Sequence, residues 1–395
     1  MLAIFLGACG WQMWNVHQYN AAVREAKEAG FKWKCDDTYS LIRKDWHNAL
    51  EKETWGEHPR ILDMGDVPDL GRYREMLHQL RPTDLYAGDC KYADLLVLKE
   101  LTALRRLHLG GNSLQNVDGL KGLTGLQELS IYNCYALQNV DGIAGFIGLQ
   151  KLHLGLCPDL RSLDGLKRLS DLQYLEISLC HALQNVNAIE GLTGLQTLWI
   201  SYCPGLRNVD GLKRLTGLKW LNLEKCDNLE NVDSLKGHAA LQELDLSGCN
   251  ALKHVNGIEG LTSLQKLNLS SCDSLKNVDG LKGLFGLQEI NVTCCPALQN
   301  VDDLKGLTAL RELDLSGCFA LQNVDGIAGL TGLQKLNLGV CSVLQNVDGL
   351  KGLTALQSLN LTGSDKIPAA ALRELRAALP NTDITFPDGT KNPPQ

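Results

Sequence analysis

Ten cysteines recur at intervals of 23 residues, and this spacing constrains the fold of the chain more than any other feature. Each cysteine closes a copy of one unit, such as residues 264–272, in which Leu264, Leu267 and Leu269 precede Cys272. A catalytic site does not repeat ten times in register, so the spacing indicates architecture: a solenoid of stacked coils. The ten residues are Cys134, Cys157, Cys180, Cys203, Cys226, Cys249, Cys272, Cys295, Cys318 and Cys341.

The pattern within each unit predicts the layers of this solenoid. Leucines at alternate positions of a short strand face inward, and the strands of successive coils pair as a parallel sheet. At 395 residues the chain could hold several ordinary domains, but a solenoid grows by adding coils rather than cores. We therefore expect an α/β fold: a curved horseshoe with a parallel sheet on its concave face and short helical turns or loops on its convex face. The regular units occupy residues 101–364, about twelve repeats of 22–23 residues each.

The cysteine position is predicted to face the interior, where a thiol behaves as a small apolar group. Neighbouring coils lie about 5 Å apart, but side chains in register point in parallel, so free thiols are expected rather than disulfides. Cys9, Cys35, Cys90 and Cys294 fall outside this ladder. In the first repeat we place Asn112 at the cysteine position, because the step from Asn112 to Cys134 is 22 residues, and in the last repeat we place Ser364 there.

After the cysteine, each unit contains an Asn-Val-Asp-Gly-Leu segment or a close variant of it. Aspartates such as Asp118, Asp141, Asp210 and Asp279 are expected to cap the short helical turn that follows them. The asparagines two residues earlier form a second column, for which we expect hydrogen bonds to the loop backbone. They are Asn116, Asn139, Asn185, Asn208, Asn231, Asn277, Asn300, Asn323 and Asn346.

The two ends of the chain differ from the repeats. Residues 15–100 are predicted to form a helical region with capping coils, including helices over residues 20–30 and 38–51, because an end coil would otherwise expose its interior. Residues 365–395 are predicted to form a small cap, with a helix over 369–379, a short strand over 384–386 and a tail.

Residues 1–14 are apolar but too short to span a bilayer. The segment Leu6-Gly7-Ala8-Cys9 resembles the lipobox of bacterial lipoproteins, which makes Cys9 a candidate for lipidation. A second interpretation is the tail of a transmembrane anchor, with Trp11 and Trp14 at the membrane interface. Both predict a membrane tether at the bacterial cell envelope. A buried N-terminal segment is the third interpretation, and a cytoplasmic or secreted location stays open.

The repeats resemble two related classes of leucine-rich repeat. The spacing from Cys272 to Leu275 resembles the cysteine-containing class, and the segment around Asn277 and Asp279 resembles the short bacterial type found in internalins. The whole of residues 101–385 resembles leucine-rich repeat proteins of exported or membrane-anchored bacterial origin. The resemblance implies a concave face that holds a protein or a polysaccharide.

Catalytic chemistry has no motif in this sequence. The nine histidines are scattered, and no P-loop, G-x-S-x-G or H-E-x-x-H pattern occurs. His108, His153 and Glu176 can share the concave face, but ordinary exposed residues explain them better than a metal site. We therefore expect no enzyme activity, no cofactor and no metal. A formal net charge of −7 gives no basic footprint for nucleic acid.

The outward strand positions divide the repeats into two groups. Repeats seven to twelve carry small polar residues there, such as Asp245, Ser247 and Asn268, and we expect them to act as a spacer. Repeats two to six carry aromatic and charged residues, and aromatic residues on a rigid sheet are the usual anchors of an interface. The candidate binding residues are Tyr132, His153, Tyr174, Glu176, Trp199, Tyr202, Trp220, Asn222 and Glu224.

These patterns favour a non-enzymatic, monomeric module for protein–protein recognition, tethered at the bacterial envelope. Two alternatives remain open at this point. One is an intracellular adaptor or secreted effector, and the other is a structural, matrix or carbohydrate-binding repeat protein.

Overall fold

The computed structural model describes residues 32–34, 61–64 and 69–391. The predicted helices over residues 20–30 and 38–51, and the candidate anchor in residues 1–14, lie outside the described residues. Within the described part, no helix combines the length and the apolar character needed to cross a membrane.

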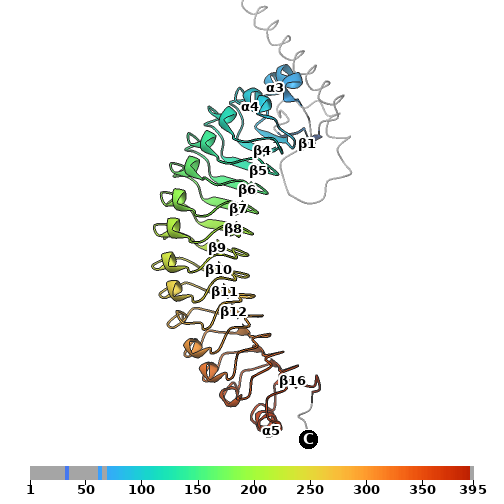
Figure 1. Cartoon of the computed structure of the whole chain (residues 1–395), viewed down its shortest axis with the longest axis vertical. Helices are drawn as coiled ribbons and strands as arrows, with labels where there is room; N and C mark the ends of the chain where they lie inside the picture. The colour runs from blue at the N-terminus through green and yellow to red at the C-terminus, as the bar shows by residue number, and fades with distance from the viewer. Residues whose placement is uncertain (1–31, 35–60, 65–68, 392–395) are drawn as a thin grey trace, which may run out of the picture.

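One open sheet of sixteen strands runs the length of the molecule, in the order of the sequence (Figure 1). The first strand, β1 (Lys32–Lys34), is antiparallel to β2 (Ile61–Asp63), and every later pairing is parallel. Strands β3 to β8 are Asp84–Ala87, Arg106–Gly110, Glu128–Tyr132, Lys151–Gly155, Tyr174–Ser178 and Thr197–Ser201. Strands β9 to β16 are Trp220–Asn222, Glu243–Asp245, Lys266–Asn268, Glu289–Asn291, Glu312–Asp314, Lys335–Asn337, Ser358–Asn360 and Asp383–Thr385.

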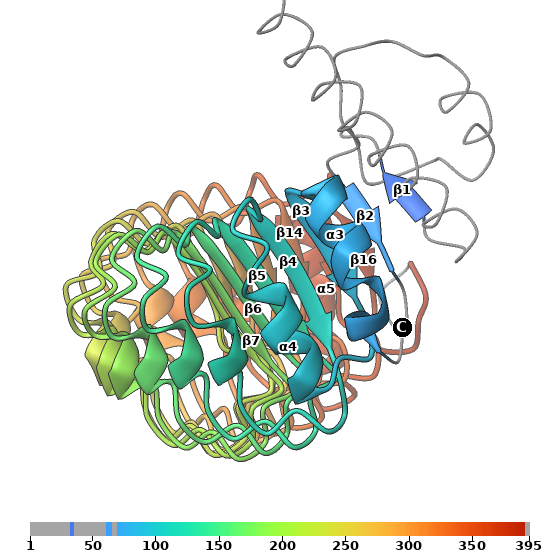
Figure 2. The same ribbon diagram turned by 90° about the horizontal axis from the view of Figure 1, so that it is seen from above.

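Short helices lie on the other side of the coils (Figures 1 and 2). Among the described residues the α-helices are α3 (Arg74–Leu80), α4 (Tyr92–Leu98) and α5 (Ala369–Ala378). The 3₁₀ helices η1 to η6 are Leu70–Tyr73, Asp118–Leu120, Asp141–Ile143, Asp164–Leu166, Asn187–Ile189 and Asp210–Leu212. The remaining ones, η7 to η11, are Asp233–Leu235, Asn256–Ile258, Asp302–Leu304, Asp325–Ile327 and Asp348–Leu350. The predicted fold class, a curved parallel solenoid, is confirmed.

Leucines and the ladder cysteines fill the interior between these layers. All ten ladder cysteines are buried and free. In nine of the ten, all but Cys134, the thiol lies within hydrogen-bonding distance of a backbone carbonyl of the preceding coil: the Sγ atom of Cys226 lies 3.4 Å from Ile200 O, and that of Cys249 lies 3.2 Å from Leu223 O. Burial raises the pKa of the Cys249 thiol to about 12, as expected of a packing residue rather than a nucleophile.

The start of the ladder differs from the sequence prediction. Asn112 is exposed in a turn, and the buried Gly111 takes the cysteine position instead. The turn geometry fixes this assignment, because Leu114 donates to Gly111 O just as Leu137 donates to Cys134 O. A side chain at Gly111 would collide with the backbone of Cys90. Cys90 is itself buried beside this glycine, so it extends the interior column, and placing it outside the ladder was wrong.

The predicted cap of the short helical turn also belongs to a different residue. The N-cap position is a valine in most repeats, such as Val117, and it makes no side-chain cap. The side chain of Asn116 accepts the amide of Asp118 at 3.0 Å, and the same bond recurs at all nine asparagines of the column. Four of the aspartates instead pair with a lysine three residues on, as Asp118 does with Lys121. The loop role predicted for the asparagines is confirmed, and the capping role predicted for the aspartates is wrong.

Strand length in the sheet follows the residue at the middle outward position. Strands β4 to β8 have five residues and carry histidine, serine, glutamate or tryptophan there. Strands β9 to β15 have three residues and end on asparagine or aspartate. In each of these seven, the side chain accepts the amide two residues on, as Asp245 does from Ser247 at 2.8 Å. That local bond competes with the sheet ladder and ends the strand early.

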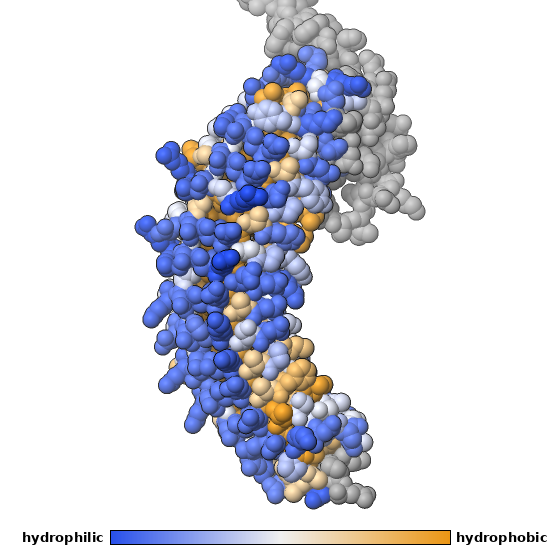
Figure 3. All heavy atoms as spheres, viewed as in Figure 1, coloured by the Kyte–Doolittle hydropathy of each residue, from blue (hydrophilic) through white to orange (hydrophobic). Residues whose placement is uncertain are grey.

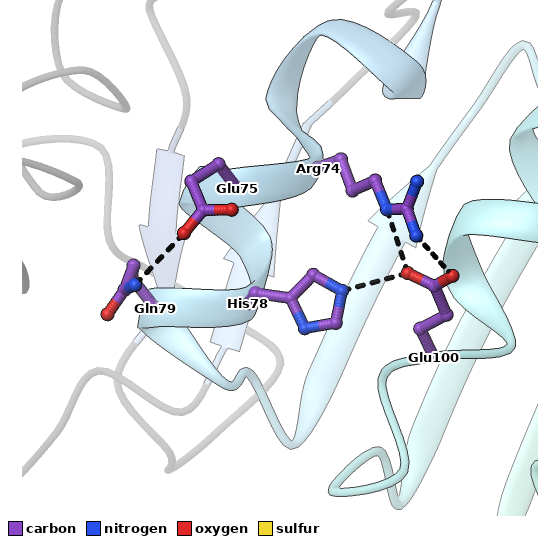
Figure 4. A network of polar contacts seen from close by, with 5 residues as sticks. All are labelled: Arg74, Glu75, His78, Gln79 and Glu100. Carbon is purple, nitrogen blue, oxygen red and sulfur yellow. Dashed lines mark hydrogen bonds and ion pairs between the residues drawn. The ribbon is translucent and has the colours of Figure 1, made fainter.

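The first coils carry full α-helices, and a charged network joins them (Figure 4). Arg74 of α3 forms two parallel hydrogen bonds to Glu100, at 2.9 and 2.6 Å, and His78 contacts the same carboxylate at 2.8 Å. The hydrogen bond with His78, followed by the one from Arg74, holds the pKa of Glu100 below its ordinary value. The bidentate geometry fixes α3 against the loop that follows α4.

At the other end, α5 and β16 close the solenoid. Pro368 is the extended N-cap residue of α5 and stands just before its first turn. The closing strand is Asp383–Thr385, one residue earlier than predicted, and it continues the parallel sheet from β15. Leu372, Leu375 and Ile384 are buried there and cover the apolar end of the last coil.

Candidate binding surface on the concave sheet

Four aromatic rings form a row across strands β5 to β8. The ring centroids of Tyr132 and His153 lie 6.5 Å apart, those of His153 and Tyr174 lie 4.9 Å apart, and those of Tyr174 and Trp199 lie 6.5 Å apart. The interplanar angles are 38°, 38° and 44°, so the rings are tilted rather than stacked flat. Tilted contacts at these distances are favourable for aromatic pairs, and they hold the row in one arrangement.

Glu176 is the polar centre of this row. Its Oε2 atom lies 2.9 Å from His153 Nδ1 and 3.3 Å from the hydroxyl of Tyr174, and its Oε1 atom accepts from Ser178 at 3.4 Å. The hydrogen bond with His153 is the main reason that the pKa of Glu176 falls below its ordinary value. Burial and the neighbouring carboxylate raise the pKa of Tyr174 to about 12. These side chains are therefore preorganised before any partner arrives.

Three aromatic side chains lie open to solvent: Trp199, which ends the row, and two residues beyond it. Trp199 is 45% exposed, Tyr202 is 44% exposed and Trp220 is 37% exposed. Trp220 opens β9, in the same column as Tyr174 and Thr197, as the strand register predicted. Tyr202 has a left-handed backbone with φ 53°, held by its amide donating to Glu224 O at 2.8 Å. Its hydroxyl also donates to the Glu224 carboxylate at 3.1 Å.

Asn222 serves the backbone more than the surface. Its Oδ1 atom accepts the amide of Glu224 at 2.9 Å, so it belongs to the strand-ending asparagine column described above. The remaining predicted site residues, from Tyr132 to Glu224, do lie together on strands β5 to β9 and the turns that follow them. Their role in binding stays a prediction.

A groove of about 920 Å³ continues along the concave face from β8 to β15. Trp199 and Trp220 stand at its first end, and Ser358 and Asn360 at its last. Most of its length therefore lies over repeats seven to twelve, which were predicted to act only as a spacer. Figure 3 shows a flank of the same solenoid, which is largely hydrophilic with apolar side chains between the coils.

The groove walls include two residues that sequence reasoning overlooked as candidates. Glu243 is exposed beside Trp220 in the strand register, and Lys266 follows it in the next strand. These two residues belong to the first outward column, which is formed by the first residue of each strand. The exact repeat period already aligns Trp220, Glu243 and Lys266 in this column. The prediction missed them because the small polar residues of the middle outward column suggested that these repeats bind little.

His108 and His153 do not converge on a metal site. The ring of His108 stacks on Tyr86 with centroids 4.1 Å apart, and His153 is paired with Glu176. Within the residues that the structure describes, no group of three or more histidine, cysteine or acidic side chains is arranged to hold a metal ion.

Comparison with known proteins supports the architecture. A model of the leucine-rich repeat domain of the endo-β-N-acetylglucosaminidase EndoS matches residues 196–279. No curated protein matches the sequence. The structure is similar to an internalin, InlF, of Listeria monocytogenes, with a TM-score of 0.61 and 20% identity over 76% of this chain and 85% of that one.

Two further solved structures share the fold. The functional domain of InlJ from Listeria monocytogenes, described as including a cysteine ladder, has a TM-score of 0.55 at 19% identity and covers 82% of this chain and 72% of that one. A leucine-rich repeat protein of Leptospira interrogans has a TM-score of 0.51 at 22% identity, and the alignment covers 89% of this chain and 100% of that one.

The sheet, the cysteine ladder and the repeat match show that the chain has the leucine-rich repeat fold. Its repeats are of the cysteine-containing kind, and the three solved structures compared above come from Listeria monocytogenes and Leptospira interrogans and include an internalin. The resemblance stated from the sequence is confirmed. At these identities the likeness shows the fold, which is one that generally serves to bind other proteins.

Proposed function

We propose that this chain is a recognition module for another protein, and that its partner binds first at the aromatic surface. The aromatic surface consists of Tyr132, His153, Tyr174, Trp199, Tyr202 and Trp220. The observation that carries the proposal is the exposure of Trp199, Tyr202 and Trp220 on a continuous parallel sheet. Burying such rings supplies much of the free energy of association in protein interfaces.

The rigidity of the surface supports the same proposal. Tyr174 and His153 are held through Glu176, and Tyr202 is held through Glu224. Side chains that are already fixed lose little conformational entropy on binding, so more of the contact energy appears as affinity. A scaffold of paired strands also moves little when a partner docks.

The polar contacts favour binding over catalysis. Ser178 and His153 both contact Glu176, at 3.4 and 2.9 Å, and no contact among the described residues joins the Ser178 hydroxyl to the His153 ring as a Ser-His-Asp triad would require. A nucleophile needs its hydroxyl within reach of the base, with the base oriented by a third group. We propose a non-enzymatic role on this basis.

We also propose that the module works at the bacterial envelope, tethered through lipid on Cys9. The support is the sequence Leu6-Gly7-Ala8-Cys9 together with the similarity to internalins. Growth of expressing bacteria with a radiolabelled fatty acid tests the tether. Label that is present in the natural chain and lost on Cys9→Ser is the expected result, and equal label in both sinks the proposal.

The recognition surface is tested by affinity capture with matched variants. The full chain, the Trp199→Ala/Trp220→Ala variant and a Phe285→Ala control serve as bait for extracts of the source cells. Phe285 is 65% exposed but lies outside the concave sheet, so it controls for the loss of an exposed aromatic ring. We expect one protein, identified by mass spectrometry, that the natural chain and the control capture and the double variant does not. Equal capture by all three folded baits would refute the aromatic surface.

A further inference from the structure

The groove beyond the aromatic surface carries an excess of negative charge. Five carboxylates and two lysines line it, a net formal charge of −3. Lys335 pairs with Glu312 at 2.6 Å, and Lys266 pairs with Glu289 at 3.6 Å. The carboxylates without a cation are Glu243, Asp245 and Asp314. Glu224 and Lys225, in the turn after β9, add one charge of each sign and cancel.

The excess is concentrated at the end of the groove where the tryptophans stand. Glu243 faces Trp220 across the strand register, on strands that are about 4.8 Å apart. Glu243 is exposed and makes no side-chain hydrogen bond or ion pair with the residues that the structure describes. An open indole face beside an unpaired carboxylate is suited to a cation, because the ring and the carboxylate both attract positive charge.

The polar groups deeper in the groove are already occupied. Asp245 accepts the amide and hydroxyl of Ser247, at 2.8 and 2.6 Å, and the side-chain amide of Asn268 at 3.0 Å. The carboxylate of Asp314 is bonded in the same way to Ser316 and Asn337. A neutral sugar chain needs free donors and acceptors for its hydroxyls, whereas a cation needs only the uncompensated charge. The groove therefore favours a cation over a neutral polysaccharide.

We propose that the groove binds an extended basic segment of the partner protein, with one arginine or lysine of that segment lying over Trp220 and paired with Glu243. This inference rests on the proposed function and adds the chemistry of the partner. The neighbouring side chains continue the match, since Asp245 and Asp314 place further negative charge along the groove floor. Arginine suits the position best, because its planar guanidinium both stacks on indole and pairs with a carboxylate.

Binding of defined peptides to the full chain tests this inference. The probes are an Arg-Ser repeat peptide, a Glu-Ser repeat peptide of the same length and a neutral β-linked glucose oligosaccharide, each titrated by calorimetry at two salt concentrations. We expect only the Arg-Ser peptide to bind, more weakly at high salt. Glu243→Gln and Trp220→Leu should each weaken it about two- to fivefold, the range for one exposed ion pair or cation–π contact.

A matched variant separates a local site from general attraction. Glu312→Gln removes the same charge from the groove wall, but from a carboxylate that Lys335 already pairs. We expect it to weaken the Arg-Ser peptide less than twofold. Equal losses for Glu243→Gln and Glu312→Gln, or binding of the oligosaccharide or the Glu-Ser peptide instead, would overturn the inference. The proposed function would survive those results if capture of a protein partner still depended on Trp199 and Trp220.

Discussion

Replacing His254 with asparagine should stabilise the protein. In ten turns of the solenoid an asparagine or serine side chain accepts the amide two residues on, as Asn231 does from Asp233 at 3.3 Å. His254 occupies this position in the turn before Ile258, and its buried Nδ1 atom has no hydrogen-bond partner among the described residues. His254→Asn supplies an oxygen of the right length and removes the unpaired nitrogen.

The magnitude follows from two opposing contributions. One intramolecular hydrogen bond adds about 0.5 to 1.5 kcal/mol, and removing an unsatisfied buried polar atom recovers roughly 1 to 3 kcal/mol. Against these gains, the half-buried imidazole loses packing area worth about 1 kcal/mol, taken from its apolar surface. The net expectation is a gain of about 0.5 to 3.5 kcal/mol in the free energy of unfolding.

Urea unfolding followed by circular dichroism measures this gain, with the slope of the transition monitored because solenoids can unfold in parts. His254→Ala is the matched control, since it removes the unpaired nitrogen but supplies no acceptor. Asn277→Ala removes the acceptor from the next turn and should cost about 0.5 to 2 kcal/mol. The reasoning fails if His254→Asn is no more stable than His254→Ala.

Two further predictions concern buried polar groups. The Ser364 hydroxyl is fully buried, accepts a hydrogen bond from the amide of Cys341 at 3.0 Å and donates one to Leu338 O at 2.7 Å. Ser364→Ala should therefore lower the free energy of unfolding by about 1 to 3 kcal/mol, and Ser364→Cys should lower it less, as measured by the same unfolding assay. The hydrogen bond with His153 lowers the pKa of Glu176 in the folded protein below its ordinary value of 4.5. The ionised carboxylate therefore stabilises the fold fully above pH 4.5, and this stabilisation is lost as the pH falls through the pKa of the folded state. The stability difference between the natural chain and Glu176→Gln should therefore stay constant at neutral pH and shrink on acidification, and a difference independent of pH down to about pH 3 would contradict the assigned pairing.

Most of the fold could be predicted from the repeat period of the sequence. A fixed step of 23 residues determines which side chains share a column, so the alignment of Tyr174, Thr197 and Trp220 followed from counting. The alignment failed in the first repeat, because its strand leucines lie 22 residues before those of the next repeat and so place Asn112 at the cysteine position. The residue 23 positions before Cys134 is Gly111, and the turn hydrogen bond from Leu114 to Gly111 shows that this count is the right one.

The cap of the helical turn was misassigned for a different reason. Asparagine and aspartate are both good capping residues, and both recur in most copies, as in Asn116 and Asp118. The sequence offers no means to tell which of two acceptors two residues apart receives the amide. The course of the groove was also beyond the sequence, since it depends on how tightly successive coils curve.

The middle outward column explains why the candidate binding residues gather where they do. From β9 to β15 its asparagines and aspartates are committed to the backbone, as Asn222 is to the amide of Glu224, so changing them costs stability. In β6 to β8 the ladder continues without them, and the position is free to carry His153, Glu176 and Trp199. Beyond β8 the first outward column, the first residue of each strand, remains free to vary without loss of this turn bond. Trp220 and Glu243 occupy that column, and the two parts of the surface are therefore continuous: a partner leaving the aromatic row meets its next variable contacts at these two residues.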